Sequence, residues 1–283
     1  MKLIKSILEM QQTADLLHRN GAKIGIVPTM GYLHEGHLSL IREAKLHADV
    51  VVTTIFVNPV QFAPNEDYKK YPRDLERDIL HASSAGSDFL FVPSVEEMYP
   101  PDYLTFVEVE KITSILEGKS RPSHFRGVTT VVAKLFNIIK PHIALFGQKD
   151  AQQAIVIKQM VRDLNYGIKI IIAPIVREED GLAMSSRNVY LSPEERKEST
   201  VIYKSLKRGE ELILSGERDA SRVVAEIVRY LNTQPLVKVD YVSVTDANTL
   251  GECSVINEKS QILISVAVRV GTTRLIDNII VNT

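Results

Sequence analysis

Short apolar runs alternate with amphipathic stretches through the first two thirds of the chain. The runs are nearly continuous in β-branched and aromatic residues, and they occupy residues 24–27, 50–57, 89–92, 143–146 and 168–176. Such runs are typical of strands in a parallel sheet that is covered on both faces. Apolar residues at helical spacing recur between them, over residues 38–48, 75–82 and 154–164. This alternation predicts a doubly wound α/β fold with ligands at the carboxyl ends of the strands.

The pattern changes after about residue 187. Ser192 suits a helix cap, Pro193 suits the first helical position, and Glu195 completes a capping box. We expect one long helix from this point to Gly216, and a second helix over residues 219–232. The remaining apolar runs predict strands, which lie over residues 239–245, 261–270 and 274–281. The second part of the chain is therefore predicted to be a small α+β domain.

Charge and cysteine usage exclude several classes of protein. Lys and Arg number 34 against 35 Asp and Glu, so the chain lacks the basic excess that nucleic-acid binding usually needs. No uncharged apolar run is long enough to span a membrane, and the first residues do not resemble a signal peptide. Cys253 is the single cysteine, which excludes an internal disulfide and a cysteine-based zinc cage. We expect a cytoplasmic protein with no nucleic-acid or membrane partner and no structural metal.

The first candidate site is PTMGYLHEGH at residues 28–37. It follows a predicted strand and opens a helix, which is the usual location for phosphate binding. His34 and His37 are three residues apart, so both project from one face of the first helical turn. Imidazoles there can donate hydrogen bonds to triphosphate oxygens. Two alternatives stay open: a helix start with two surface histidines, and a zinc site that includes His47.

Two further strings could bind phosphate. In GQKDAQQ at residues 147–153, Lys149 could meet a phosphate and Asp150 a ribose, although Asp150 and Gln153 also match a capping box that needs no ligand. The string Met184-Ser185-Ser186-Arg187 follows a turn at residues 180–181. Its hydroxyls and guanidinium suit a phosphate clamp, although such strings are also common in surface loops.

A fourth string, FVNPVQF at residues 56–62, leads into a stretch that is long for an α/β connection. The neutral amide of Gln61 could orient a hydroxy acid without cancelling its charge. Asp78, on a predicted helix over residues 74–84, could hold Mg²⁺ or could be a solvated helical carboxylate. Residues 58–72 and 117–127 are both interpreted as functional loops.

Together with YPRD at 71–74, HFRGV at 124–128 and GLAMSSRN at 181–188, these strings resemble the pantothenate synthetase (pantoate–β-alanine ligase) family. The resemblance runs in order across about 160 residues. In the wider class I nucleotidyltransferases, an H-x-G-H motif and a later K-M-S-K-S loop hold ATP from opposite sides. Residues 184–187 resemble that second element. The resemblance implies a Rossmann-like catalytic domain over residues 1–186, a lid domain over residues 187–283, and a homodimer.

The resemblance also implies a reaction. The pantoate carboxylate attacks the α-phosphorus of ATP to give pantoyl-adenylate and pyrophosphate, and the β-alanine amine then releases pantothenate and AMP. ATP would act with Mg²⁺, held in part by Asp78. The matching catalytic positions are His34, His37 and Lys149, and the pair that binds pantoate or β-alanine is Gln61 and Gln153. The matching ATP-binding positions are Met30, Gly31, Tyr32, Leu33, His34, Glu35, Gly36, His37, Gly147, Gln148, Lys149, Asp150, Val176, Met184, Ser185, Ser186 and Arg187.

Two other functions remain as alternatives. One is a nucleotidyltransferase that stops at a nucleotide-linked product, which would release no AMP in response to an amine. The other is a nucleotide-binding sensor without catalysis, which would bind ATP but release no pyrophosphate with any hydroxy acid.

Overall fold

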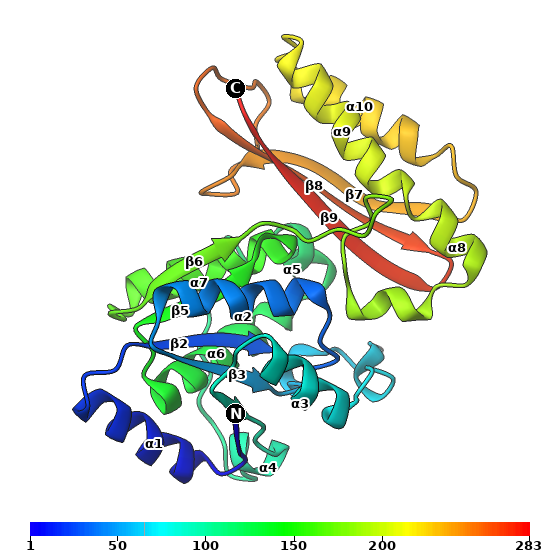
Figure 1. The fold of residues 1–283 in the computed structure, drawn as a ribbon. Helices are drawn as coiled ribbons and strands as arrows, with labels where there is room; N and C mark the ends of the chain where they lie inside the picture. Colours follow the sequence, from blue (N-terminus) through cyan, green and yellow to red (C-terminus); the bar gives the residue numbers. More distant parts are fainter. Residues whose placement is uncertain (65) are drawn as a thin grey trace. The chain divides into compact units, whose positions relative to one another are not determined.

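The computed structural model describes residues 1–64 and 66–283, and it divides into two compact units (Figure 1). The first unit contains Met1–Gln148 and Gln153–Pro174, and the second contains Lys149–Gln152 and Ile175–Thr283. The division near residue 175 lies N-terminal to the boundary expected after residue 186. The reason is a hairpin, described below, whose side chains are anchored on the last strand of the second unit.

The first unit is built on a sheet of six parallel strands in the order β1-β4-β3-β2-β5-β6. The chain reverses its direction of travel across the sheet between β2 and β5, and in open α/β sheets ligands bind at such a switch point. The predicted parallel sheet is confirmed, although β1 was not predicted. The run over residues 168–176 forms a strand only as far as Ala173, because Pro174 cannot donate to the ladder. The strands are β1 (Lys2–Ile4), β2 (Ile24–Thr29), β3 (Val50–Ile55), β4 (Phe89–Phe91), β5 (Ile143–Gly147) and β6 (Lys169–Ala173).

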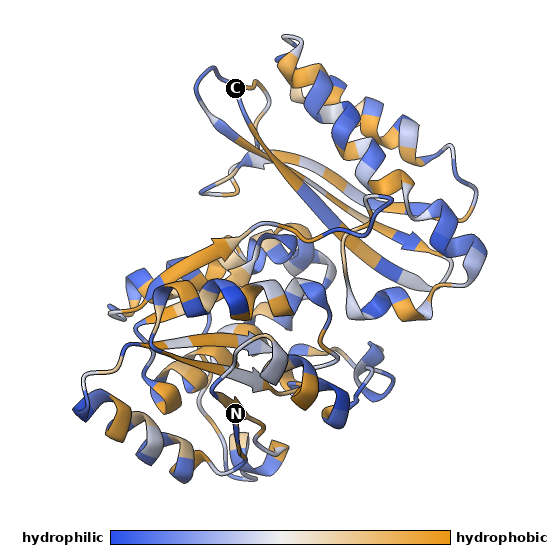
Figure 2. Ribbon diagram, in the orientation of Figure 1, coloured by the Kyte–Doolittle hydropathy of each residue, from blue (hydrophilic) through white to orange (hydrophobic). Residues whose placement is uncertain are grey.

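Helices cover both faces of this sheet, so the doubly wound architecture is confirmed. One apolar cluster joins the sheet to α1, α6 and α7, and a second cluster joins it to α2 and α3. Figure 2 shows the strands as hydrophobic segments among helices that carry mixed polar and apolar residues. The helices along this part of the chain are α1 (Ile7–Arg19), α2 (Glu35–His47), α3 (Leu75–Ser84), α4 (Val95–Met98), α5 (Leu116–Ser120), α6 (His124–Ile139) and α7 (Ala151–Asp163).

The two stretches interpreted as loops contain regular turns. Residues 58–72 include the 3₁₀ helices η1 (Pro59–Gln61) and η2 (Asp67–Lys69), and Asn65 lies outside the described residues. The interpretation of residues 117–127 as a loop was wrong, because this stretch holds most of α5 and the first turn of α6.

The second unit pairs helices with an antiparallel sheet in the order β7-β8-β9. The predicted capping box of Ser192 and Glu195 is confirmed. The prediction of one long helix was wrong, because the chain breaks at Ser199 and Thr200. Their hydroxyls donate to the carbonyl oxygens of Glu195 and Lys197, and such bonds compete with regular helix. The elements are η4 (Ser186–Tyr190), α8 (Pro193–Glu198), α9 (Val201–Leu214), α10 (Ala220–Leu231), β7 (Val237–Asp246), β8 (Gln261–Val270) and β9 (Thr273–Asn282).

Across the described ranges, no helix combines the length and the apolar character needed to cross a bilayer.

Candidate functional site

The loop from β2 into α2 carries the two histidines to the N-terminus of α2. His34 is the N-cap residue, and its backbone N–H donates to Nδ1 of His37 at 3.3 Å. The two ring centroids lie 4.1 Å apart. Because Nδ1 of His37 accepts a hydrogen bond, the neutral ring carries its proton on Nε2 and is a donor there. The structure therefore brings an imidazole donor to a helix N-terminus, where the helix dipole favours anions.

Asp78 on α3 holds the backbone of this loop. Its two carboxylate oxygens accept hydrogen bonds from the N–H groups of Tyr32 at 2.7 Å and Leu33 at 2.6 Å. The residue is only 1% exposed. Burial raises the pKa of the Asp78 carboxyl, although the hydrogen bonds from Leu33 and Tyr32 act in the opposite direction. Asp78 thus fixes the approach of the chain to His34.

Arg77, the residue before Asp78, contacts the same loop through a backbone carbonyl and an aromatic ring. It donates to the Leu33 carbonyl at 3.1 Å, and its guanidinium lies 4.8 Å from the centroid of the Tyr32 ring. Gly31 has φ +82°, and a Cβ there would meet Ile55 at 2.8 Å and the Asp78 carboxylate at 3.0 Å. The loop conformation therefore depends on glycine at this position.

These contacts do not suit the expected role of Asp78 as a magnesium ligand. Both of its oxygens already face backbone N–H donors, and the side chain is almost fully buried. Mg²⁺ usually keeps several waters and binds through carboxylates that it can reach together with substrate phosphates. In the part of the chain that the structure describes, no group of three or more His, Cys, Asp or Glu side chains could hold a metal. We interpret Asp78 as a residue that positions the loop.

We predict that Asp78→Asn lowers the free energy of unfolding by about 1–3 kcal/mol, because an amide can accept only one of the two bonds and leaves a buried N–H unpaired. Urea unfolding would measure the change. Asp74→Asn is the matched control: Asp74 caps the same helix by accepting from the Arg77 N–H at 3.1 Å, and asparagine caps about as well. Equal stability of the two variants would contradict the prediction. A higher Mg²⁺ requirement in Asp78→Asn would instead favour the metal role.

The alternative zinc site does not form around these histidines. His47 is the last residue of α2, ten residues beyond His37, and about 1.5 Å of rise per residue puts it at the other end of the helix. Its Nε2 lies 2.8 Å from Oε1 of Glu43 on the same helix.

Gln61 lies in η1, after β3, and its side chain is part of a buried network. Its Oε1 accepts from Nδ2 of Asn58 at 3.1 Å, and its Nε2 donates to the sulfur of Met30 at 3.0 Å. Met30 belongs to the loop that leads to His34. The structure therefore brings the predicted pantoate residue into contact with the predicted ATP loop.

The remaining ATP-site candidates on this loop differ in their burial and in their side-chain contacts. Leu33 is fully buried in the core, so its side chain is occupied by packing. Glu35 is exposed and forms an ion pair with Arg42. Gly36 lies in the first turn of α2 between Glu35 and His37.

The segment after β5 holds the second group of candidates. Gly147 ends β5, Gln148 to Asp150 form η3, and Gln153 lies in the first turn of α7. The Lys149 ammonium is 3.8 Å from the Asp150 carboxylate. The backbone carbonyl of Lys149 accepts from Nδ2 of Asn278 on β9 at 3.0 Å. The last strand of the chain therefore takes part in positioning Lys149.

Residues 176–188 form a hairpin that presents the third group. Met184 N–H donates to the Val176 carbonyl at 3.0 Å, and Ser185 caps η4 by accepting from the Arg187 N–H at 3.3 Å. Ser186 is buried. The serine–arginine string thus forms the start of a short helix.

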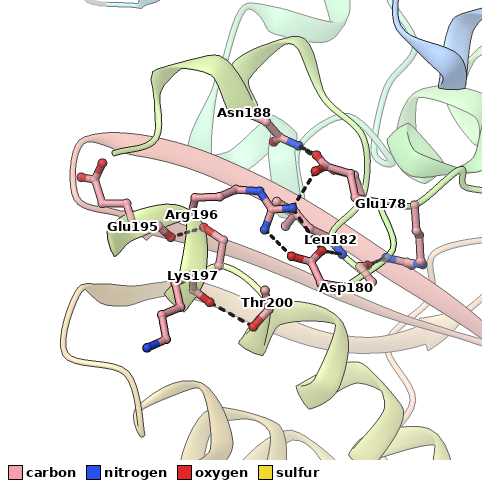
Figure 3. Close-up of polar contacts among 12 residues, drawn as sticks. Glu178, Asp180, Leu182, Asn188, Glu195, Arg196, Lys197 and Thr200 are labelled. Carbon is pink, nitrogen blue, oxygen red and sulfur yellow. Dashed lines mark hydrogen bonds and ion pairs between the residues drawn. The ribbon is translucent and has the colours of Figure 1, made fainter. Parts of the chain in front are cut away.

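A cluster of charged side chains holds this hairpin against α8. Arg196 of α8 donates to Glu178 at 2.6 Å and to Asp180 at 2.7 Å. Figure 3 shows how these side chains face one another. Asn188 donates to Glu178 at 3.0 Å and to the Ala183 carbonyl at 3.1 Å. The Arg196 guanidinium lowers the pKa of the Asp180 carboxyl.

A second anchor joins the hairpin to β9. Arg177 makes a two-pronged ion pair with Asp277, at 2.6 and 2.9 Å, and its guanidinium stacks 3.9 Å from the centroid of the Tyr203 ring. Burial raises the pKa of Asp277, and the adjacent Arg177 opposes that shift. Asp277 and Asn278 are neighbours on β9, so adjacent residues contact the hairpin and Lys149.

Sequence reasoning missed the residues that hold these segments. They are Asn58, Arg77, His124, Arg177, Arg196, Asp277 and Asn278. The HFRGV string was the only signal that pointed to His124, the FVNPVQF string contained Asn58 without giving it a role, and nothing local marked the others.

Comparisons with known proteins agree on one family. A model of the family "Pantoate-beta-alanine ligase" matches residues 2–280. Pantothenate synthetase from Thermoanaerobacter sp. (strain X514) is 60% identical over 261 residues, which cover 92% of each chain. The crystal structure of pantothenate synthetase from Thermus thermophilus has a TM-score of 0.92 at 43% identity and covers 99% of both chains.

A third similar protein was solved with ligands. Pantoate-beta-alanine ligase from Francisella tularensis, complexed with beta-gamma ATP and beta-alanine, has a TM-score of 0.80 at 37% identity. The match covers 99% of this chain and 97% of that one. The chain therefore belongs to the pantoate-beta-alanine ligase family of enzymes.

Proposed function

We propose that the described residues perform the family's reaction, the ATP-dependent condensation of pantoate with β-alanine, in two steps through a bound pantoyl-adenylate. The observation that carries the proposal is the pair His34 and His37 at the N-terminus of α2, beside the switch point of the sheet. The Francisella relative binds an ATP analogue and β-alanine, which supports the same ligands here.

ATP would be held by two groups of residues. His34 and His37 would donate to its phosphates from the loop after β2, with Met30, Gly31, Tyr32, Leu33, Glu35 and Gly36 shaping that loop. Lys149, Ser185, Ser186 and Arg187 would also contact phosphates. Gly147 and Asp150 would face the ribose, Gln148 would belong to the same ATP-binding segment, and the backbone of Val176 and Met184 would face adenine. His37 would supply the main donor as charge develops on the leaving pyrophosphate.

We propose that Gln61 and Gln153 bind pantoate. The network around Gln61 supports this role, because it turns a neutral donor toward the loop that holds ATP without adding a charge.

We predict that Gln61→Ala raises the KM for pantoate by about 10-fold or more, since a lost hydrogen bond to a charged group costs about 1.5–3 kcal/mol. The KM for ATP should change little. Steady-state kinetics with each substrate varied in turn would measure both constants. A larger effect on ATP than on pantoate would overturn the assignment. An unchanged urea midpoint is the control for folding.

The other expected features belong to the same proposal. Mg²⁺ would enter with the ATP phosphates, where it would neutralise their charge. The second domain would act as a lid that excludes water from the hydrolysable adenylate. We also expect a homodimer and a reduced, cytoplasmic setting, in keeping with the free thiol of Cys253. Release of AMP that depends on β-alanine separates this ligase from an enzyme that stops at a nucleotide-linked product and from a sensor.

A further inference from the structure

The first turn of α6 supports η1, the turn that carries Gln61. This turn contains the HFRG string at residues 124–127, which has no part in the function proposed so far. A Cβ at Gly127 would lie 2.6 Å from both the backbone nitrogen and the Cα of Gln61. The backbone of α6 therefore lies directly against the backbone of η1, and only glycine allows this approach.

His124 links the two elements through a buried hydrogen bond. Its Nδ1 lies 3.0 Å from the carbonyl oxygen of Gln61. A carbonyl can only accept, so the ring carries its proton on Nδ1. Nε2 must then accept, and it lies 3.2 Å from Nη1 of Arg121, a group that can only donate. The neighbours of His124 therefore fix a single tautomer.

Two further features keep His124 in this state. Arg121 is itself fixed by a two-pronged ion pair with Glu66, at 2.6 and 2.9 Å. Burial and the positive charge of Arg121 lower the pKa of His124 to about 4, so the ring is neutral near pH 7. The Nδ1–H donor to Gln61 is thus present under ordinary conditions.

Asn58 fixes the orientation of the Gln61 side chain. Its Nδ2 donates to the Gly127 carbonyl at 3.0 Å and to Oε1 of Gln61 at 3.1 Å, while its Oδ1 accepts from the Val60 N–H at 3.3 Å. Because Gly127 O only accepts and Val60 N–H only donates, the Asn58 amide cannot be turned over. The Gln61 atom that faces Asn58 must be the acceptor, which leaves the Nε2 donors on the other side. The Met30 sulfur is a weak acceptor, so an oxygen of a ligand can replace it.

We propose that His124 is a positioning residue for Gln61, and that the HFRG turn makes Gln61 present an N–H donor to a carboxylate or hydroxyl oxygen of the substrate. This inference rests on the proposed role of Gln61 in binding pantoate. It gives the HFRG string a role. It also predicts selectivity: next to Nε2 of Gln61, the site favours a ligand oxygen that accepts a hydrogen bond and disfavours a ligand group that donates one.

Two isosteric variants distinguish the roles of the two ring nitrogens of His124. In His124→Asn the amide nitrogen occupies the place of Nδ1 and can still donate to the Gln61 carbonyl. In His124→Gln the amide occupies the place of Nε2, so it keeps the contact with Arg121 but loses the bond to Gln61. We expect His124→Gln to raise the pantoate KM about 5- to 10-fold with the ATP KM unchanged, and His124→Asn to stay near the wild type.

His142→Gln is the matched control. Nδ1 of His142 also bonds a backbone group, because it accepts from the Ile24 N–H at 3.0 Å. Ile24 is the first residue of β2, so this contact lies at the amino end of the strand, whereas the proposed site lies at its carboxyl end. This variant should leave both KM values unchanged. In a Gln61→Ala background, His124→Gln should add no further increase in the pantoate KM, because the residue that it positions is already gone.

The outcomes are distinguishable. If Gln61→Ala raises the pantoate KM but His124→Gln does not, or raises it no more than His124→Asn, the positioning role is wrong and the proposed function stands. If Gln61→Ala leaves the pantoate KM unchanged, the pantoate assignment fails and the positioning role fails with it. Should His124→Gln not fold, Arg121→Met removes the side-chain donor that faces Nε2 of His124. It should then raise the pantoate KM selectively, and an unchanged value would overturn the role.

Discussion

Replacing His37 with alanine should slow adenylate formation by about 10²–10³-fold, equivalent to about 2.7–4 kcal/mol of transition-state stabilisation. That is the usual effect of removing one preorganised donor from the point where charge develops. In this chain Nδ1 of His37 accepts from the His34 N–H, so Nε2 carries the proton and is the donor. The ring also lies at the N-terminus of α2, where the helix dipole adds to the attraction for an anion.

The measurement is the rate of pyrophosphate release with saturating ATP and pantoate, in single turnover so that product release does not mask the step. His37→Gln should retain more of the rate than His37→Ala, because its amide nitrogen reaches the place of the imidazole Nε2. His47→Ala, at the other end of the same helix, is the control and should be close to the wild type. A near wild-type rate for His37→Ala would remove the histidine from the mechanism.

The architecture of the sheet could be predicted because each strand is marked by a pattern within a short stretch of sequence. Strands covered on both faces are nearly continuous in apolar residues. The runs that became β2, β3, β4, β5 and β6 follow that pattern with few polar exceptions, such as the buried Thr53 and Thr54 of β3. Helices α2, α3 and α7 were predictable for a similar reason, since each buries one face and repeats it at helical spacing.

Helix α6 shows where that reasoning fails. Thirteen of its 16 residues are buried, so its polar face is reduced to Arg126, Lys134 and Asn137. Its segment 128–132 is rich in β-branched residues, which favour strands. Burial of most of its surface, which no local pattern records, makes it a helix.

The candidate site also has one part that the sequence predicts and one part that it does not. The strings predicted to bind phosphate are contiguous, so the chain shows them as motifs. Their supports come from distant residues: Asp78 reaches Leu33 across 45 positions, His124 reaches Gln61 across 63, and Asn278 reaches Lys149 across 129. Asp78 was noticed as a possible magnesium ligand on a predicted helix, and its partners then gave it a different role from the one expected. Spacing in a sequence cannot encode such contacts, because they depend on how strands and helices pack.

Pyrophosphate exchange should show the largest expected effect, because the exchange reaction should be present with pantoate and absent without it. Without β-alanine, the enzyme should exchange labelled pyrophosphate into ATP only when pantoate is added. An ionised carboxylate is a poor electrophile, since attack by an amine would have to expel an oxide. Joining it to AMP supplies a stable leaving group, so activation has to come before the amide bond forms. The reverse of that activation step is what exchange detects.

No covalent alternative competes within the described residues. Cys253 is the single thiol, it lies in the second unit, and burial raises its pKa, which makes it a poor nucleophile at neutral pH. The chain also has no G-x-S-x-G elbow for a serine nucleophile. We therefore expect the activated pantoate to stay bound without a covalent link.

Isotope transfer tests the same intermediate by a different route. When the pantoate carboxylate carries ¹⁸O, attack on the α-phosphorus leaves one labelled oxygen bridging carbon and phosphorus. Attack by the β-alanine amine then breaks the carbon–oxygen bond, so that labelled oxygen leaves with AMP. Mass spectrometry of AMP after full turnover should find one ¹⁸O atom. Unlabelled AMP together with exchange that does not need pantoate would require the carboxylate to be activated through some other species.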